Sequence, residues 1–563
     1  KPFQIAFILL NLRGTVDKEH QDREMVDLAW FPTGGGKTEA YLGLIAFASF
    51  FRRISEQTQD RERHAPSVTT IMRYTLRLLT ADQAARLVRL VGGMNAVAER
   101  DELGHDRDFA PFRVGMWIGK DASPNRLYRS EFAGHRKDSA ERLISDAKEG
   151  IPIRGATIAP FSTCPWCGDA SVGQVESYEI TKEGWSKPRP RVATKCKNTT
   201  CTFSKEVPFT TVDEDIYLNP PTILLATADK FVQAAYNPSA KNAGDGYKAY
   251  SVRRLLGMEV NEGDNRPLPP EIVIQDELHL LSGPLGTMAG LLETALAVAW
   301  KETSGHKPKY IAATATIRGA DRDVGLMYGR SLNVFPPPLL NASDNFFSTA
   351  SESRGRLHVG ILASGARARS ALEQSAASML SSSTVAKNSG VDVAAVDPYW
   401  TLVMYYNSLR ELGGGMTAVQ QNVPRWMSQY GGEDGRRDFS AQPIELTSRR
   451  SSSELSEYRG RLNHSLSSDL PVVDVLHTSN MFQVGIDIKR LGAMAIIGQP
   501  RSNSEYIQSS GRVGRGKGPG LVLSLLRDRF PRDLSHFELF KSFHQELFRH
   551  VDRTSITPFA LRA

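Results

Sequence analysis

The sequence predicts an α/β protein with two blocks of parallel β-sheet and a small metal-binding insertion in the first block. Short apolar runs alternate with longer helical patterns, which is typical of parallel strands covered by helices. A softer segment at 333–356 divides these runs into two groups, and all four cysteines fall between Cys164 and Cys201. The length of 563 residues allows three or four domains at roughly 150 residues each.

Composition narrows the class of protein. Hydrophobic residues make up 40% and charged residues 23%, as in soluble globular proteins. No apolar run reaches the roughly eighteen residues that span a bilayer. The apolar stretch at 5–10 has no small-residue cleavage site after it, so we expect a buried first helix there rather than a signal peptide. A net charge of +7 permits a polyanionic partner without requiring one.

The chain is expected to work in a reducing, cytoplasmic compartment, because its few cysteines are confined to one segment. It begins with Lys1 rather than Met, which suggests a piece of a longer protein.

The predicted elements follow one another along both blocks. The strand candidates are Asp27–Phe31, Val114–Ile118, Thr222–Ala226, Glu271–Gln275, Tyr310–Ala313, Leu357–Leu362, Trp400–Tyr406, Val472–Leu476, Ala493–Ile497 and Gly520–Leu525. Helical patterns cover Glu39–Arg53 and Leu285–Trp300, and the Ser-, Ala- and Val-rich stretch 381–397 is predicted as an insertion or surface loop. We expect a first lobe over 1–335 with an insertion at 160–212, a proline-marked linker over 336–356, and a second lobe over 357–563.

A phosphate-binding loop is predicted at 32–38, where Pro-Thr-Gly-Gly-Gly-Lys-Thr follows a strand and opens a helix. Glycines let backbone N–H groups turn toward a phosphate, and a helix N-terminus favours negative charge. Lysine supplies a positive charge to the β- and γ-phosphates, and the threonine hydroxyl suits Mg²⁺. The alternative is a glycine-rich loop with a chance Lys-Thr pair. The residues expected to bind nucleotide are Thr33, Gly34, Gly35, Gly36, Lys37 and Thr38.

Two acids end the apolar run at 271–275. Asp276 is expected to hold Mg²⁺ and Glu277 to act as general base, because acids at the carboxyl end of a parallel strand face the ligand crevice. His279 is expected nearby as a residue that couples ATP state to the rest of the protein. A solvated helix start with a chance Asp-Glu pair is the alternative.

An arginine pair marks the second block. Gln508, Arg512 and Arg515 lie in the segment Gln-Ser-Ser-Gly-Arg-Val-Gly-Arg, and the arginines are expected to reach a phosphate. A solvated basic turn is the alternative. Just upstream, Thr478 and the run 484–487, with Gly485 and Asp487, form a strand-turn-helix pattern with a fixed acid, or a hydrophobic turn capped by aspartate.

The four cysteines form two pairs whose spacing suits one structural Zn²⁺ site. The ligands would be Cys164, Cys167, Cys196 and Cys201. Four reduced thiols or two disulfides are the alternatives. Between the pairs, the strip with Lys187, Arg189 and Arg191 around Trp185 could follow a phosphate backbone, form a solvated hairpin or dock a partner subunit.

Taken together, these motifs resemble a superfamily-two helicase core, in which two RecA-like lobes close on ATP. The resemblance implies coupling roles for Thr314 and Thr316 and an adenine contact for Gln4, although a buried polar residue on an amphipathic helix is an alternative for Gln4. It also implies nucleotide contacts at Gly485 and Asp487. The implied nucleic-acid contacts are Arg77, Thr227, Lys230, Ser408, Thr447 and Thr478.

The sequence of residues 30–43 is similar to that of the DrmA helicases of the bacterial DISARM anti-phage system. That similarity implies an ATP-dependent helicase or translocase acting on DNA, with Mg²⁺ and a protein partner resembling the DrmB subunit. Repair helicases share many of these motifs, so a DNA-repair helicase is an alternative. An ATP-gated DNA clamp that recruits a partner without unwinding is the second hypothesis, and no further acidic cluster suggests a nuclease.

Overall fold

The computed structural model describes the chain except for residues 1, 32–34, 56–66, 75–76, 101–110, 120–122, 129–138, 152–157, 159, 162, 175–177, 183–188, 228–229, 232–251, 259–267, 306, 315–318, 338–345, 348–354, 366, 438, 440–442, 451, 484–487, 517, 554 and 559–563. The chain divides into two compact units. Unit 1 comprises Lys1–Ala350 together with Arg553–Ala563, and unit 2 comprises Ser351–Asp552.

Unit 1 is built on a parallel eight-stranded sheet in the order β10-β1-β9-β8-β2-β7-β3-β6. Its central strands are buried along their whole length, as expected when helices cover both faces. The strands are β1 (Met25–Trp30), β2 (Thr70–Tyr74), β3 (Val114–Trp117), β6 (Phe209–Thr210), β7 (Ile223–Thr227), β8 (Ile272–Gln275), β9 (Lys309–Thr314) and β10 (Ser331–Phe335).

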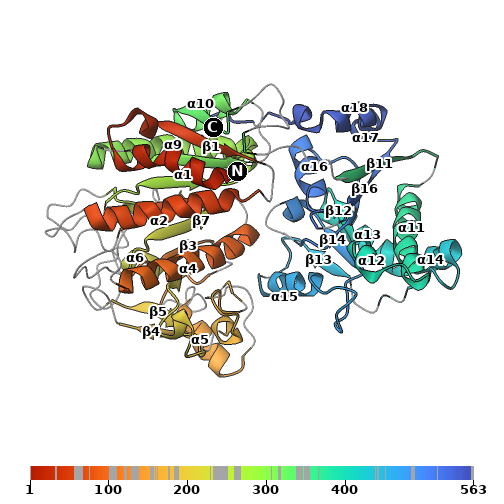
Figure 1. Cartoon of the computed structure of the whole chain (residues 1–563), viewed down its shortest axis with the longest axis horizontal. Helices are drawn as coiled ribbons and strands as arrows, with labels where there is room; N and C mark the ends of the chain where they lie inside the picture. The colour runs from red at the N-terminus through yellow and green to blue at the C-terminus, as the bar shows by residue number, and fades with distance from the viewer. Residues whose placement is uncertain are drawn as a thin grey trace. The chain divides into compact units, whose positions relative to one another are not determined.

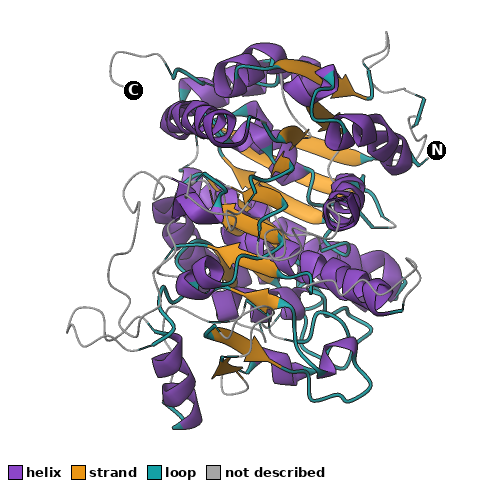
Figure 2. Ribbon diagram, turned by 90° about the vertical axis from the view of Figure 1, so that its left-hand side faces the viewer, coloured by secondary structure: helices purple, strands orange, loops and turns teal. Residues whose placement is uncertain are grey.

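Helices lie on both sides of this sheet (Figures 1 and 2). Right-handed crossovers place the helices after β1 and β2 on one face and those after β8 and β9 on the other, because the strand order advances in opposite directions. The helices are α1 (Phe3–Val16), η1 (Gln21–Glu24), α2 (Lys37–Ser55), α4 (Arg77–Glu99), α6 (Asp213–Leu218), α8 (Val252–Leu255), η6 (Leu278–Leu280), α9 (Gly283–Ser304) and α10 (Ala320–Tyr328).

A small subdomain follows β3 and carries the cysteines. It contains α5 (Ala140–Lys148), the short helices η3 (Ala170–Gly173) and η5 (Thr202–Ser204), and an antiparallel pair, β4 (Tyr178–Thr181) with β5 (Arg191–Thr194). Leu127, Ile158 and Val192 belong to its own apolar core. The predicted insertion at 160–212 therefore lies within a larger subdomain whose core includes residues that precede it.

The end of the chain returns to unit 1, whereas the sequence predicted that the second lobe runs to 563. The Gly283 N–H donates to the Ser555 carbonyl at 2.6 Å, and the hydroxyls of Thr287 and Thr557 lie 3.0 Å apart. Ile556 is buried in the unit 1 core beside α9. Gly290 permits this approach, because a Cβ there would meet Pro558 at 3.3 Å.

Unit 2 is built on a parallel six-stranded sheet in the order β11-β16-β15-β12-β14-β13. The strands are β11 (Arg356–Ala363), β12 (Leu402–Tyr406), β13 (Ile444–Leu446), β14 (Val475–Thr478), β15 (Ala493–Ile497) and β16 (Gly520–Arg527). The helices are α11 (Ala368–Asn388), α12 (Val393–Trp400), α13 (Leu409–Gln421), α14 (Val423–Gly431), α15 (Ser452–Leu462), η7 (Asn480–Gln483), α16 (Asn503–Ser510), α17 (Pro531–Glu538), α18 (Phe540–Gln545) and η8 (Leu547–His550).

The predicted loop at 381–397 is wrong, because most of it belongs to α11 and α12. The hydroxyls of Ser383 and Thr384 donate to the Leu380 carbonyl at 3.0 and 2.8 Å, so these small polar side chains are satisfied within the helix. Ala376, Ala377 and Leu380 supply the buried face of α11. The serine-rich composition concealed this apolar face.

Buried polar groups stiffen unit 2 at two places. The Arg437 guanidinium lies 3.5 Å from the centre of the Trp400 ring and donates to the Asp474 carboxylate at 3.1 Å. At the other place, the Tyr506 hydroxyl lies 2.8 Å from His544 Nε2 and 3.1 Å from His358 Nδ1. Burial lowers the pKa of His358 to about 4, helped by neighbouring histidines.

Within the described residues, no helix is both long enough and apolar enough to cross a membrane.

Candidate functional site

The predicted glycine-rich loop lies between β1 and α2, and its last two residues, Lys37 and Thr38, begin α2. Lys37 Nζ donates to the Phe31 carbonyl at 2.7 Å, so the lysine side chain lies against the residue that follows β1. Gly36 has a φ of 85°, and a Cβ there would lie 2.6 Å from Gln4 Nε2. The positive φ therefore favours glycine at this position. Thr33 and Gly34 lie outside the described residues.

Gln4 lies beside this loop on α1. Its Nε2 is 3.4 Å from the carbonyl oxygens of both Gly35 and Gly36. The helix is anchored there by Phe3, whose ring stacks on Phe31 with centroids 3.7 Å apart. Gln4 is half-buried, and the structure places this side chain, predicted to read adenine, beside Gly35 and Gly36.

The carboxyl end of β8 brings two acids to the same region. Asp276 is buried, and its Oδ2 accepts from the Tyr41 hydroxyl at 2.6 Å. The same hydroxyl lies 3.0 Å from Thr38 Oγ1. Tyr41 thus joins the loop threonine to the strand-end aspartate, which is the pair predicted to hold Mg²⁺.

Tyr41 was not among the predicted site residues. It lies three positions after Thr38 on α2, so both side chains share one face of the helix. That spacing was the available signal, but the contact to Asp276 depends on where β8 ends.

Glu277 adopts a left-handed backbone conformation, with φ 48° and ψ 51°. Its N–H donates to Asp276 Oδ1 at 2.8 Å, which fixes the two neighbouring acids relative to one another. Its Oε2 lies 3.5 Å from His279 Nδ1. A non-glycine residue held in this region stores strain of about 1–3 kcal/mol, a feature that clusters at functional sites.

His279 connects this acid pair to the neighbouring strand. Its Nδ1 lies 3.0 Å from the Thr314 hydroxyl at the end of β9, and both side chains are buried. The ends of β1, β8 and β9 therefore carry Lys37, Glu277 and Thr314 to one edge of the sheet. Thr316 lies outside the described residues.

The residues predicted to contact nucleic acid from unit 1 have different surroundings. Thr227 is buried at the end of β7. Lys230 is also buried, and its ammonium donates to Asp213 at 2.6 Å, so in this structure its charge is satisfied inside the unit. Arg77 begins α4, and its side chain lies outside the described residues. Nearby Arg73 pairs with Glu293 in the core.

In unit 2, three predicted contacts follow the carboxyl ends of adjacent strands. Ser408 is exposed after β12 and caps α13, accepting from the Glu411 N–H at 3.2 Å. Thr478 ends β14, and its hydroxyl donates to the Leu446 carbonyl at 3.0 Å. Thr447 follows β13 and is fully buried. Only Ser408 of these three presents a solvent-exposed side chain.

The arginine pair of unit 2 is not a solvated turn. Arg512 is buried, and its Nε donates to the Gln483 carbonyl at 3.0 Å. Arg515 Nε donates to the Gly511 carbonyl at 2.8 Å, which also accepts from Arg356 Nη2 at 2.9 Å. Burial lowers the pKa of the Arg356 guanidinium, and the charge of Arg515 adds to this effect.

Gln508 is buried on α16, in the helix that precedes the arginine pair. Gly485 and Asp487 lie outside the described residues.

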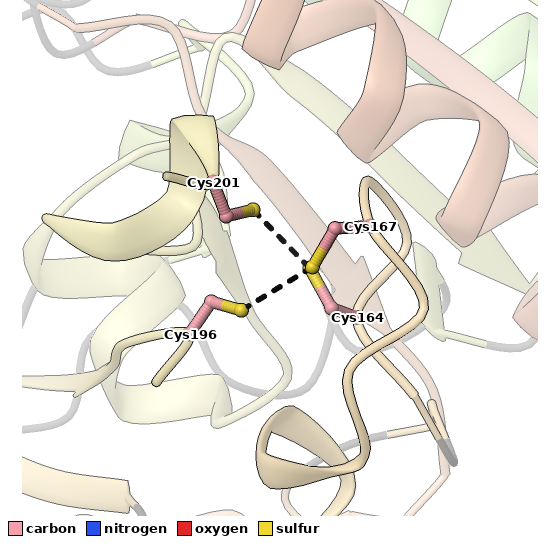
Figure 3. A group of neighbouring side chains, drawn as sticks. All are labelled: Cys164, Cys167, Cys196 and Cys201. Atoms are coloured by element: carbon pink, nitrogen blue, oxygen red, sulfur yellow. Dashed lines mark hydrogen bonds between the residues drawn. The ribbon is translucent and has the colours of Figure 1, made fainter. Parts of the chain in front are cut away.

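The four cysteine sulfurs converge from two loops (Figure 3), and all lie within 4.8 Å of one another. Cys164 and Cys201 are 3.8 Å apart, and Cys167 and Cys196 are 3.5 Å apart. Tetrahedral Zn²⁺ with sulfur ligands at about 2.3 Å holds them about 3.8 Å apart, whereas a disulfide needs about 2.05 Å. The donor set therefore fits Zn²⁺.

The first cysteine loop is a tight turn. The Gly168 N–H donates to the Cys164 carbonyl at 2.9 Å, and Gly168 has a φ of 83°, which favours glycine. A backbone hydrogen bond from Asp169 lowers the pKa of the Cys167 thiol to about 7. Burial raises the pKa of Cys196 to about 11 and of Cys201 to about 12.

The basic strip between the cysteine pairs is turned inward where it is described. Arg189 donates to the Leu218 carbonyl at 2.7 Å, and Arg191 pairs with Glu206. These two arginines tie the strip to its own subdomain rather than presenting free charge. Trp185 and Lys187 lie outside the described residues.

Comparisons with known proteins agree with this architecture. Residues 461–517 match the helicase conserved C-terminal domain. The DISARM protein DrmA of Bacillus paralicheniformis is 37% identical over 588 aligned residues, which cover 100% of this chain and 51% of that protein. The chain thus spans about half the length of this curated relative.

Two solved helicase structures share the fold. The DUF1998 helicase MrfA bound to DNA matches with a TM-score of 0.53 and 14% identity, over 100% of this chain and 50% of that one. Lhr of Mycobacterium smegmatis, bound to single-stranded DNA and AMP-PNP, matches with a TM-score of 0.51 and 14% identity, over 99% of this chain and 51% of that one.

The parallel α/β sheets of the two units are consistent with RecA-like lobes and share the fold of these helicase structures, which confirms the predicted fold class. Among particular proteins, it is similar to DrmA along its whole length.

Proposed function

We propose that this chain is the ATP-hydrolysing motor core of a DNA helicase or translocase that serves anti-phage defence in a DISARM-like system. The observation that carries the proposal is the Tyr41 hydroxyl, which joins Thr38 and Asp276 at 3.0 and 2.6 Å. A phosphate loop and a strand-end acid tied together in this way suit one nucleotide–metal site.

The residues present fit Mg²⁺, because a hydroxyl and a carboxylate are the hard oxygen ligands that this ion prefers. Thr38 and Asp276 would hold it, and when bound it would neutralise phosphate charge. Lys37 would place its ammonium on the β- and γ-phosphates, and Gln4 would read the adenine. Glu277 would accept the proton of the attacking water at its carboxylate, held in place by its backbone and by His279.

The remaining predicted roles are part of the same proposal. Thr314 and Thr316 would couple nucleotide state to nucleic-acid grip, and Gln508, Arg512 and Arg515 would support turnover. The contacts to DNA would come from Arg77, Thr227, Lys230, Ser408, Thr447 and Thr478. In the present arrangement Lys230 would have to leave Asp213 to reach a phosphate, so it is the weakest member of this set.

ATP turnover tests the proposal. Rates would be measured without nucleic acid and then with single-stranded DNA, duplex DNA, forked DNA and RNA. We expect strong stimulation by DNA and none by RNA. Lys37→Ala should abolish turnover, whereas Lys301→Ala, which changes an exposed lysine on α9, should leave it unchanged. Normal turnover in the Lys37 variant would remove the phosphate-loop assignment.

Strand displacement separates a motor from an ATP-gated clamp. A motor should unwind forked DNA with ATP, whereas a clamp should hydrolyse ATP and bind DNA without displacing a strand. Glu277→Gln should retain ATP and lengthen the lifetime of the DNA complex, because the base is lost while binding is kept.

A protein partner resembling the DrmB subunit also belongs to the proposal, since DrmA is described as a DISARM protein. Coexpression of the two and size-exclusion chromatography would test the pairing. Separate elution at micromolar concentration would remove the partner from the proposal.

A further inference from the structure

The cysteine subdomain is packed directly against helix α4. Phe203, two residues after Cys201, lies over the helix at Gly92. A Cβ added at Gly92 would lie 2.6 and 2.8 Å from atoms of the Phe203 ring. The Trp166 ring reaches the same glycine, at 3.3 Å from that Cβ position. The two rings meet edge to face, with centroids 5.7 Å apart. Only a residue without a side chain allows this contact.

Hydrogen bonds of the Phe203 backbone connect this residue to both cysteines of the second loop. Its N–H donates to Cys201 Sγ at 3.4 Å, and its carbonyl accepts from the Cys196 N–H at 2.9 Å. Its side chain is fully buried. The positions of Cys196 and Cys201 therefore determine where the Phe203 ring presses on α4.

The first cysteine loop holds α4 independently. Arg89 Nε donates to the Pro165 carbonyl at 2.6 Å, between Cys164 and Cys167. Arg89 and Gly92 lie one turn apart on the helix, so both cysteine loops touch the same face of α4. A metal ion that joins the two loops would thus also fix them together on this helix.

Helix α4 begins at Arg77, roughly 22 Å from Gly92 at 1.5 Å per residue. A helix transmits a displacement along its axis, so a shift at Gly92 moves the segment that starts at Arg77.

We propose that Zn²⁺ bound by the four cysteines positions α4, so that zinc and nucleic acid bind cooperatively to this protein. The inference rests on the proposed function, in which the start of α4 contacts DNA. Coupled binding is reciprocal: if zinc raises the affinity for DNA by some factor, DNA raises the affinity for zinc by the same factor. A subdomain that only adds stability would show no such reciprocity.

Gly92 and its neighbour Gly93 provide a matched pair of variants. Gly92→Ala places a methyl group against Phe203, whereas Gly93→Ala meets nothing within 4 Å. Both variants gain the same helix propensity, so their difference reports the packing contact alone. Arg89→Met is a second variant that removes the donor to Pro165 while keeping the length of the side chain.

Zinc affinity would be measured by chelator competition, and DNA affinity by fluorescence anisotropy of a labelled single-stranded oligonucleotide. We expect Gly92→Ala to weaken zinc and DNA binding by about tenfold each, within the usual range of coupling between sites. Gly93→Ala should remain within about twofold of the wild type, and Arg89→Met should follow Gly92→Ala. Removing zinc should lower the DNA affinity by some factor. Saturating DNA should then raise the zinc affinity by the same factor.

Equal zinc affinities for the Gly92 and Gly93 variants would overturn the packing step. DNA affinity that is the same with and without zinc would overturn the coupling and leave the proposed function standing. If the protein binds no DNA but Gly92→Ala still weakens zinc binding, the proposed function is overturned. The packing of the cysteine loops on α4 would then still stand.

Discussion

The strained backbone at Glu277 predicts that two variants, which should both lose ATP turnover, differ in stability. Among the residues that the structure describes, Glu277 is the only non-glycine with a positive φ, at 48°. An L-residue in the left-handed region costs about 1–2 kcal/mol, and a glycine costs about 0.5–1 kcal/mol in chain entropy. Glu277→Gly should therefore be more stable than Glu277→Ala by about 0.5–1 kcal/mol.

The comparison between these two variants cancels the loss of the carboxylate, since both remove it and its contact to His279. A difference of that size corresponds to about 1–2 °C in the melting temperature of a large unit. Calorimetry and equilibrium urea unfolding would measure it, and ATP hydrolysis should be lost in both variants.

Ala295→Gly on α9 provides the control with the opposite sign. Ala295 is exposed in an ordinary helix, so glycine there should destabilise by about 0.5–1 kcal/mol. If Glu277→Ala proves as stable as Glu277→Gly, the left-handed conformation is not strained and the reasoning fails.

Three other perturbations have defined outcomes. Tyr41→Phe removes a hydrogen bond to a buried carboxylate, so unfolding free energy should fall by about 1.5–3 kcal/mol and the Mg²⁺ dependence of ATP turnover should shift; no change in either would contradict the bridging role. Arg437→Ala leaves the buried Asp474 without its partner, so the free energy of unfolding measured in urea should fall by about 3–5 kcal/mol. A fall of less than about 1 kcal/mol would contradict a stabilising ion pair. Burial holds the pKa of His358 and His536 near 4, below the unfolded value of about 6.5, so the unfolded state binds protons in this window. Stability should therefore decline as pH falls from about 6.5 to 4, by about 1 kcal/mol per pH unit for each group, and His536→Asn should flatten a profile measured by pH-dependent melting.

The sequence predicted most of the two sheets because their strands are apolar runs with turn residues between them. Strand β2 was missed, although it lies at the centre of the unit 1 sheet. Its sequence, Thr-Ile-Met-Arg-Tyr, carries a charge that reads as exposed. Arg73 is buried there because Glu293, far away in the chain, supplies its counter-charge. Such a partner depends on tertiary structure and leaves no local pattern.

The candidate site divides in the same way. The glycine loop and the strand-end acids follow from short spacings, and the structure places their described members together. The surroundings of Lys230 and Arg512 could not be predicted, since a basic side chain in a short motif gives no sign of whether it is solvated. Each is buried by groups that the fold supplies, Asp213 for the lysine and the Gln483 carbonyl for the arginine.

Because residues 555–558 contact α9, unit 2 is an insertion within unit 1 and has two chain connections to it. A single proteolytic cut between residues 350 and 351 would leave unit 2 covalently attached to residues 553–563, the C-terminal part of unit 1. During synthesis, α9 cannot receive its Ser555 and Ile556 contacts until the whole of unit 2 has left the ribosome. A gene truncated after Ala350 would therefore encode a first lobe that lacks part of its own core.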